Sequence, residues 1–202
     1  MTLLAAVEDL PAREMRVGLE RKYRVSVEQE AGDRYAYRLR VRVIKPTLPK
    51  IEGSKTPDPS LRLEIRLTDY RATLNEQGVS APFIGGGEME IDPTGLPHGI
   101  DVTGLLGPVW LPVLSFYRPV EEGAFDVSHV SVGSGLELVG KGVLAKKEGK
   151  PMIDLNARLT AGAREFGKLN LSTRLDGGGW PERAEGTFIS ADGTYHLKLE
   201  RA

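Results

Sequence analysis

Residues 35–44 read Tyr-Ala-Tyr-Arg-Leu-Arg-Val-Arg-Val-Ile, so that large apolar side chains alternate with arginines. A β-strand sends successive side chains to opposite faces, which gives this segment one apolar face and one charged face. The same period recurs in residues 23–28, 61–67 and 169–175, and polar or glycine-rich turns separate such segments. Successive strands with no helical segments between them favour an antiparallel meander.

The sequence therefore predicts an all-β protein of about ten strands with at most one or two short helices. We expect a single strongly curved antiparallel sheet, as a half-barrel or open barrel, with a β-sandwich as the alternative. The length of 202 residues fits one domain. That domain covers residues 17–202, and residues 1–16 form an N-terminal extension with room for a short helix. Residues 46–60 hold four prolines and are expected to form a long exposed loop.

One segment departs from the alternation. Residues 105–117 are nearly all apolar and include two prolines, which resist placement in a central strand. We expect an irregular crossover with its C-terminal part either helical or edge-like. Three roles fit such a segment: cover for the core, a wall of an apolar ligand site, or a protein interface.

The ligand role gives the preferred functional hypothesis: a non-enzymatic binding or carrier domain for an apolar small molecule or lipid. The crossover would lie against the concave face of the sheet. The predicted ligand-binding residues are Leu106, Val109, Trp110, Leu111, Leu114, Phe116 and Tyr117 of the crossover and Tyr35, Tyr37 and Leu39 of the strand. The alternative is a structural or protein-interaction module of the bacterial cell envelope, with a protein partner or a homodimer formed through a sheet edge.

No catalytic, metal or cofactor site is predicted, and an enzyme is not expected. The chain has no cysteine, and its histidines, His98, His129 and His196, have no metal-ligand spacing. Glu88, Glu90 and Asp92 share one strand face, which we interpret as solvated. The formal net charge of -1 argues against bulk attraction to nucleic acid.

The arginines Arg38, Arg40 and Arg42 are interpreted as a solvated outer surface. Tyr35 and Tyr37 lie on the opposite face of the same strand, whereas nucleic-acid platforms place aromatic and basic side chains together. This arrangement is a second argument against nucleic-acid binding.

Four segments carry a resemblance to a known type of protein: residues 18–23, Trp110-Leu111-Pro112 before Phe125, residues 179–188 and residues 192–199. Across residues 17–201 the chain resembles uncharacterised bacterial secreted domains and lipoproteins of the lipoprotein-carrier-like half-barrel type. The resemblance implies an extracytoplasmic setting and an apolar ligand cavity. No segment reaches the roughly 20 apolar residues of a membrane span. Residues 1–7 lack a basic start, so we expect a periplasmic location if a leader was removed and a cytoplasmic one otherwise.

Overall fold

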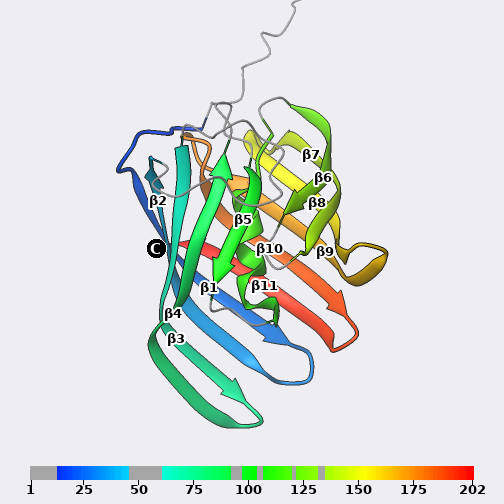
Figure 1. Cartoon of the computed structure of the whole chain (residues 1–202). Coiled ribbons are helices and arrows are strands. Elements are labelled where there is room, and N and C mark those ends of the chain that lie inside the picture. The colour runs from blue at the N-terminus through cyan, green and yellow to red at the C-terminus, as the bar shows by residue number, and fades with distance from the viewer. Residues whose placement is uncertain (1–12, 46–60, 92–96, 104–106, 120–121, 132–134) are drawn as a thin grey trace, which may run out of the picture.

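The structure of the protein is a computed structural model that describes residues 13–45, 61–91, 97–103, 107–119, 122–131 and 135–202. These residues form eleven strands and one 3₁₀ helix (Figure 1). The strands of the first half are β1 (Glu20–Gln29), β2 (Arg34–Ile44), β3 (Leu61–Leu74), β4 (Gln77–Ile91) and β5 (Pro97–Thr103), followed by the helix η1 (Gly107–Phe116). The second half holds β6 (Gly123–Ser131), β7 (Glu137–Lys147), β8 (Lys150–Ala161), β9 (Arg164–Leu175), β10 (Pro181–Ser190) and β11 (Gly193–Arg201).

All described strands belong to one sheet, in the order β1-β11-β10-β9-β8-β7-β6-β5-β4-β3-β2. Apart from β5 and β6, strands that follow one another in the sequence pair antiparallel, and β1 also pairs antiparallel with β11 through seven residue pairs. The two remaining edges, β5 and β6, meet only at the parallel pair Gly99–Ser131. The sheet therefore curls almost fully round and stays open along most of this seam. The prediction of a single strongly curved antiparallel sheet is confirmed.

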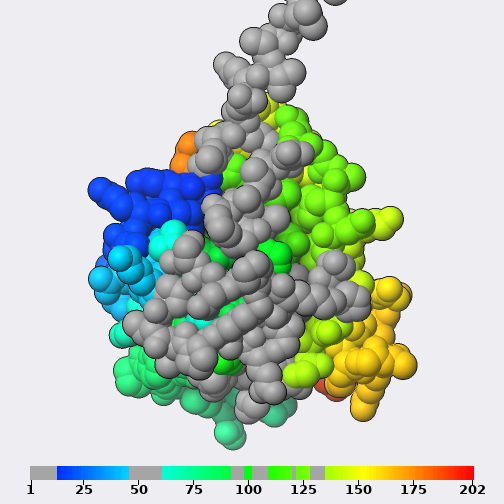
Figure 2. Space-filling model, turned by 45° about the horizontal axis from the view of Figure 1, so that its top comes forward, coloured from blue at the N-terminus to red at the C-terminus, as the bar shows by residue number. Residues whose placement is uncertain are grey.

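Alternation in the sequence becomes alternation in burial. In β2, the side chains of Tyr37, Leu39 and Val41 are buried, and the arginines between them point outward. Arg38 reaches Asp69 at 3.2 Å on the outer surface, as the sequence predicts for a solvated arginine row. In Figure 2 the residues of β1 to β4 lie on one side of the molecule and those of β6 to β9 on the other.

Two hairpin turns are set by left-handed residues. Glu148 and Gly149 have φ angles of 53° and 76°, and Lys147 pairs with Lys150 across them. Two successive positive φ values are typical of the type I′ turn, whose twist matches that of the flanking strands. Glu148 and Gly149 therefore form the tight turn between β7 and β8. The β3–β4 hairpin turns in the same way at Asn75 and Glu76, and in Figure 1 it projects beyond the other hairpins.

The structure corrects one interpretation of β4. Residues 85–87, a run of three glycines, lie inside the strand and begin at a register shift, where Leu67 pairs with Gly85 and Thr68 with Phe83. Glu90 is fully buried rather than solvated, and the Arg62 guanidinium donates hydrogen bonds to Glu88 at 2.8 Å and to Glu90 at 3.3 Å. An ion pair of this kind cannot be foreseen from the alternating pattern, because the pattern assigns all three side chains to the outer face.

The apolar crossover forms η1, which lies within the curve of the sheet in Figure 1. Pro112 lies inside the helix and has no amide hydrogen to donate. A 3₁₀ helix of this length is uncommon, because the geometry of its hydrogen bonds is poorer than that of an α-helix. No helix of the described residues is long and apolar enough to span a membrane. The predictions for residues 1–12 and 46–60 lie outside the described residues.

Candidate ligand-binding site

The concave face of the sheet is an apolar wall made by strands from both halves of the chain. Its buried side chains belong to one continuous core cluster. They include Val25, Val27, Leu39, Val41, Leu63, Ile65 and Leu67 from β1 to β3, and Leu155, Leu169, Leu171, Leu197 and Leu199 from β8, β9 and β11. A wall of this composition needs an apolar cover, since leaving it in water costs roughly 25 cal/mol per Å² of exposed apolar surface.

The helix η1 supplies that cover. Val109, Leu111, Val113, Leu114 and Phe116 are each at most 6% exposed. The helix packs against β1, β9, β10 and β11. Because apolar side chains leave the helix on all sides, it is suited to a position enclosed by the sheet. Three roles were considered for the crossover, and these contacts show that η1 covers the core.

The predicted ligand-binding residues come together in the fold. Val109, Trp110, Leu111, Leu114, Phe116, Tyr117, Tyr37 and Leu39 are buried members of the main core cluster, and Tyr35 packs against it partly exposed. Leu106 lies outside the described residues. The set is therefore one contiguous region on the concave face, and η1 occupies its middle.

Two buried polar side chains hold the ends of η1. The Tyr37 hydroxyl donates a hydrogen bond to the Val109 carbonyl at 2.6 Å, and burial raises the pKa of Tyr37 far above its ordinary value. At the other end, the Arg13 guanidinium donates to the Phe116 carbonyl at 2.6 Å and to the Gly179 carbonyl at 3.4 Å. A cation at the C-terminal end of a helix also faces the negative end of its dipole.

Arg13 belongs to an arginine cluster at the end of the barrel where β9 turns into β10. Arg13 and Arg118 are 8% and 4% exposed. Burial, with a smaller contribution from Arg118, lowers the pKa of Arg13 to about 9. Trp180, fully buried, has the guanidinium carbons of Arg13 and Arg21 at 5.4 and 5.8 Å from its ring centroid.

Sequence reasoning missed this cluster. Arg118 directly follows the apolar crossover, which is a usable signal for a cation at the end of a helix. Arg13 gives no such signal, because it reaches Gly179 across 166 positions of sequence. Asp176 organises the same turn: its carboxylate accepts from the Gly178 and Trp180 amides at 2.9 Å each and pairs with Arg201.

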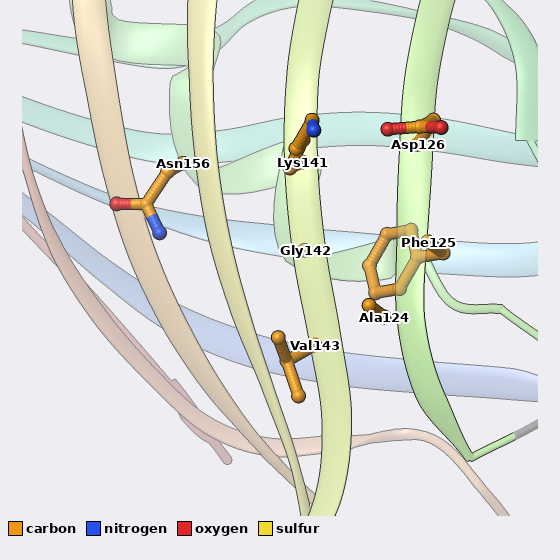
Figure 3. Close-up of a pocket in the computed structure, with 7 residues that line it drawn as sticks. All are labelled: Ala124, Phe125, Asp126, Lys141, Gly142, Val143 and Asn156. Atoms are coloured by element: carbon orange, nitrogen blue, oxygen red, sulfur yellow. The ribbon is translucent and has the colours of Figure 1, made fainter.

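A second concavity lies on the outer surface, across β6, β7 and β8. It is an open groove of about 370 Å³. Asp126, Lys141 and Asn156 stand opposite one another on the three strands and line it (Figure 3). Phe125 packs over Gly142 and stacks on Tyr117 with ring centroids 5.8 Å apart. Phe125 therefore lines the groove and also contacts the apolar core.

The ionisable residues give no catalytic or metal-binding arrangement within the described part of the chain. No group of three or more histidine, aspartate or glutamate side chains there could hold a metal ion. His196 lies 3.5 Å from Glu30 on the surface, and the side chain of His129 lies outside the described residues. The predicted absence of a catalytic set stays a prediction.

Comparison with known proteins gives no family. No protein-family model matches the chain, and no curated protein is similar to it. The similar solved structures include a de novo designed fluorescence-activating β-barrel (11% identity, TM-score 0.27, covering 95% of this chain and 97% of that chain). A redesigned β-barrel bound to DFHBI is also similar (10% identity, TM-score 0.26, covering 93% and 100%). Similarity at this level supports no inference about fold or function, so the functional argument rests on the site itself.

Proposed function

We propose that the protein binds an apolar small molecule or lipid chain against the concave face of its sheet, in the space that η1 fills. The observation that carries this proposal is the way in which η1 is held. The helix lies in the connection between β5 and β6 and is not itself a strand of the sheet. Tyr37 donates one hydrogen bond to its first turn and Arg13 donates one to its last residue, and Arg13 also binds the Gly179 carbonyl.

Such a cover can be exchanged without breaking the sheet. The side chains of η1 are replaceable by an acyl chain, because both present hydrocarbon to the same leucine and valine wall. β5 precedes η1 in the sequence and β6 follows it, and these two strands are joined at one residue pair. Movement of η1 therefore disturbs the weakest joint of the sheet and leaves the long ladders in place.

The proposal predicts that loosening η1 improves binding. The binding-competent state is the one in which η1 has moved, and a small population of that state lowers the apparent affinity. Tyr37→Phe removes the hydrogen bond to Val109 and keeps the ring. If this bond contributes about 1 kcal/mol to the closed state, the variant binds about fivefold more tightly.

The experiment measures uptake of the neutral fluorescent probe N-phenyl-1-naphthylamine by delipidated protein, followed by displacement with lipids. Tyr70→Phe is the matched control, because Tyr70 lies on β3, is partly buried and does not belong to the predicted ligand-binding residues. We expect saturable uptake by the wild type, tighter uptake by Tyr37→Phe and no change for Tyr70→Phe. Absence of uptake in all three proteins contradicts the proposal. Concentration-dependent dimerisation in light scattering together with that absence would favour the interaction module instead.

A further inference from the structure

Four neighbouring hairpins form one end of the sheet. The hairpins β8–β9, β10–β11, β1–β2 and β3–β4 follow one another in the strand order, and all of them turn at this end (Figure 1). The β9–β10 turn that binds Arg13 lies at the opposite end, since β9 and β10 run between the two. We call the four turns and the strand residues beside them the hairpin rim, which comprises residues 28–35, 71–81, 158–168 and 187–195.

Exposed apolar side chains lie on three of these four hairpins. Val79 is the third residue of β4, Phe166 is the third of β9, and Ile189 is the last but one of β10. Their exposed fractions are 49%, 38% and 49%. A single exposed apolar residue is ordinary, whereas several at one end of a molecule indicate an interaction surface. The other large apolar side chains that are exposed in the described part of the chain are Val17, Phe83 and Val143.

The concave face of the sheet continues onto the hairpin rim. Val27, Tyr35, Ala72 and Val79 pair with one another in a single row across β1, β2, β3 and β4. Val27 and Ala72 are buried, and Val79 at the end of the row is half-exposed. The apolar wall of the candidate site therefore reaches the surface on the β3–β4 hairpin, which projects beyond the other hairpins (Figure 1).

Two tyrosines accompany this apolar row. Tyr35 packs against the core and is partly exposed, and Tyr195 lies beside Phe188 with ring centroids 6.4 Å apart. Neither hydroxyl forms a hydrogen bond with another of the described residues. A tyrosine with its ring against apolar groups and its hydroxyl toward water is typical of the interface between a membrane and water.

The charge of the hairpin rim is balanced. A surface that binds anionic lipid or nucleic acid carries an excess of lysine and arginine. The rim has no such excess, and its mixed charges instead match zwitterionic head groups, which carry one charge of each sign. Its acids are Glu28, Glu30, Asp33, Glu76, Glu165 and Asp192, and its bases are Arg34, Arg71, Arg158, Arg164 and Lys168.

We propose that the hairpin rim docks on the surface of a zwitterionic lipid bilayer. Val79, Phe166 and Ile189 enter the head-group region, and the two tyrosines lie at its boundary with water. This goes beyond the proposed function, because docking does not require a ligand on the concave face. The row from Val79 to Val27 would give a lipid chain an apolar path from the bilayer to the core.

The first experiment measures flotation of the full chain with vesicles of phosphatidylcholine. We expect the wild type to float with the vesicles. Val79→Ser, Phe166→Ser and Ile189→Ser should each lower the partition coefficient about three- to tenfold, because each loses the burial of about half a side chain. Val143→Ser is the matched control, since Val143 is 45% exposed and lies on β7 outside the rim. All four replace exposed residues, so that the variants should fold like the wild type.

A second readout locates the contact. Phe166→Trp places a fluorescent reporter on the rim, and Val143→Trp places one on β7. Trp110 and Trp180 are buried and contribute equally to both variants. With vesicles of phosphatidylcholine, the emission of Phe166→Trp should shift to the blue and should be quenched by brominated lipid chains. The emission of Val143→Trp should remain unchanged.

Four results would overturn the proposal. They are absence of flotation, an equal loss of flotation in Val143→Ser and the rim variants, and a fluorescence shift in Val143→Trp alone. The fourth is binding that requires phosphatidylglycerol and is lost in about 0.5 M NaCl, which would indicate attraction to the arginines of β2. If light scattering without vesicles shows a dimer that the rim variants abolish, the rim is an interface between two copies of the chain and the bilayer is the wrong partner. Flotation and uptake of N-phenyl-1-naphthylamine are separate measurements, so failure of one proposal leaves the other standing.

Discussion

Tyr37→Phe offers a quantitative test of how η1 is anchored, independent of any ligand. The variant deletes a buried hydroxyl that donates to the Val109 carbonyl at 2.6 Å, and both groups lie in the core. Loss of the bond leaves a buried carbonyl without its donor, which costs about 1–3 kcal/mol. We therefore expect the free energy of unfolding at pH 7 to fall by that amount.

The same variant should gain relative stability in alkali. An unfolded tyrosine ionises near pH 10, whereas burial holds the pKa of Tyr37 far above that value in the folded protein. Above about pH 10 the unfolded state therefore releases a proton that the folded state keeps, and wild-type stability falls by about 1.4 kcal/mol per pH unit on this account. Phenylalanine has no such proton. The deficit of Tyr37→Phe should thus shrink by about 1.4 kcal/mol between pH 7 and pH 11.

Urea unfolding at a series of pH values, followed by tryptophan fluorescence, measures this difference. Both tryptophans, Trp110 and Trp180, are at most 9% exposed, so that unfolding changes their surroundings. The other tyrosines are present in both proteins, so their contributions to the pH dependence of the free energy of unfolding cancel in the difference. Tyr35→Phe is the control: burial also raises the pKa of Tyr35, but that side chain is partly exposed, so its deficit should be smaller and should shrink less between pH 7 and pH 11. A deficit for Tyr37→Phe that stays constant from pH 7 to pH 11 would show that Tyr37 ionises freely in the folded state, and the anchoring argument would be refuted.

Three further substitutions test the packing of the sheet by urea unfolding. Gly142→Ala should cost about 1–3 kcal/mol, because the new methyl group would overlap the Phe125 ring, and Phe125→Leu in the same chain should recover part of the loss. Glu90→Gln should cost about 3–5 kcal/mol since it leaves buried Arg62 without one of its carboxylates, whereas Glu64→Gln, on the surface beside Arg66, should cost less than about 1 kcal/mol. Phe83→Ser should change stability by no more than about 0.5 kcal/mol, because Phe83 is 58% exposed, and a larger loss would place it in a contact of the folded chain.

The sheet could be predicted because its determinants are local. Alternation in residues 35–44 fixes which side of β2 is buried, and the Glu148-Gly149 pair fixes the turn between β7 and β8. Closure of the sheet is different. It depends on the pairing of β1 with β11, from Tyr23–Arg201 to Gln29–Tyr195, between the two ends of the described chain. Strand periodicity says which residues face inward and leaves open which strand lies beside which.

The candidate site was predictable in its apolar part only. A run of apolar residues interrupted by prolines identifies a segment that must be covered, and Trp110, Leu111 and Leu114 are indeed buried together. The polar groups that hold it, Tyr37 and Arg13, could not be assigned. Tyr37 has the same sequence environment as Tyr35, and only the position of η1 makes one an anchor and the other a partly exposed residue.

Arg13 joins the C-terminal end of η1 to the β9–β10 turn. One guanidinium binds the end of η1 through Phe116 and the β9–β10 turn through Gly179, and its neighbour Glu14 pairs with the same turn through a backbone hydrogen bond to Gly178. A movement of η1 therefore removes one contact of Arg13 and leaves the others, so the cation remains at the end of the vacated space. The bond of Arg13 to Phe116 is therefore the part of this network that stabilises the closed position of η1, since its bond to Gly179 does not depend on η1.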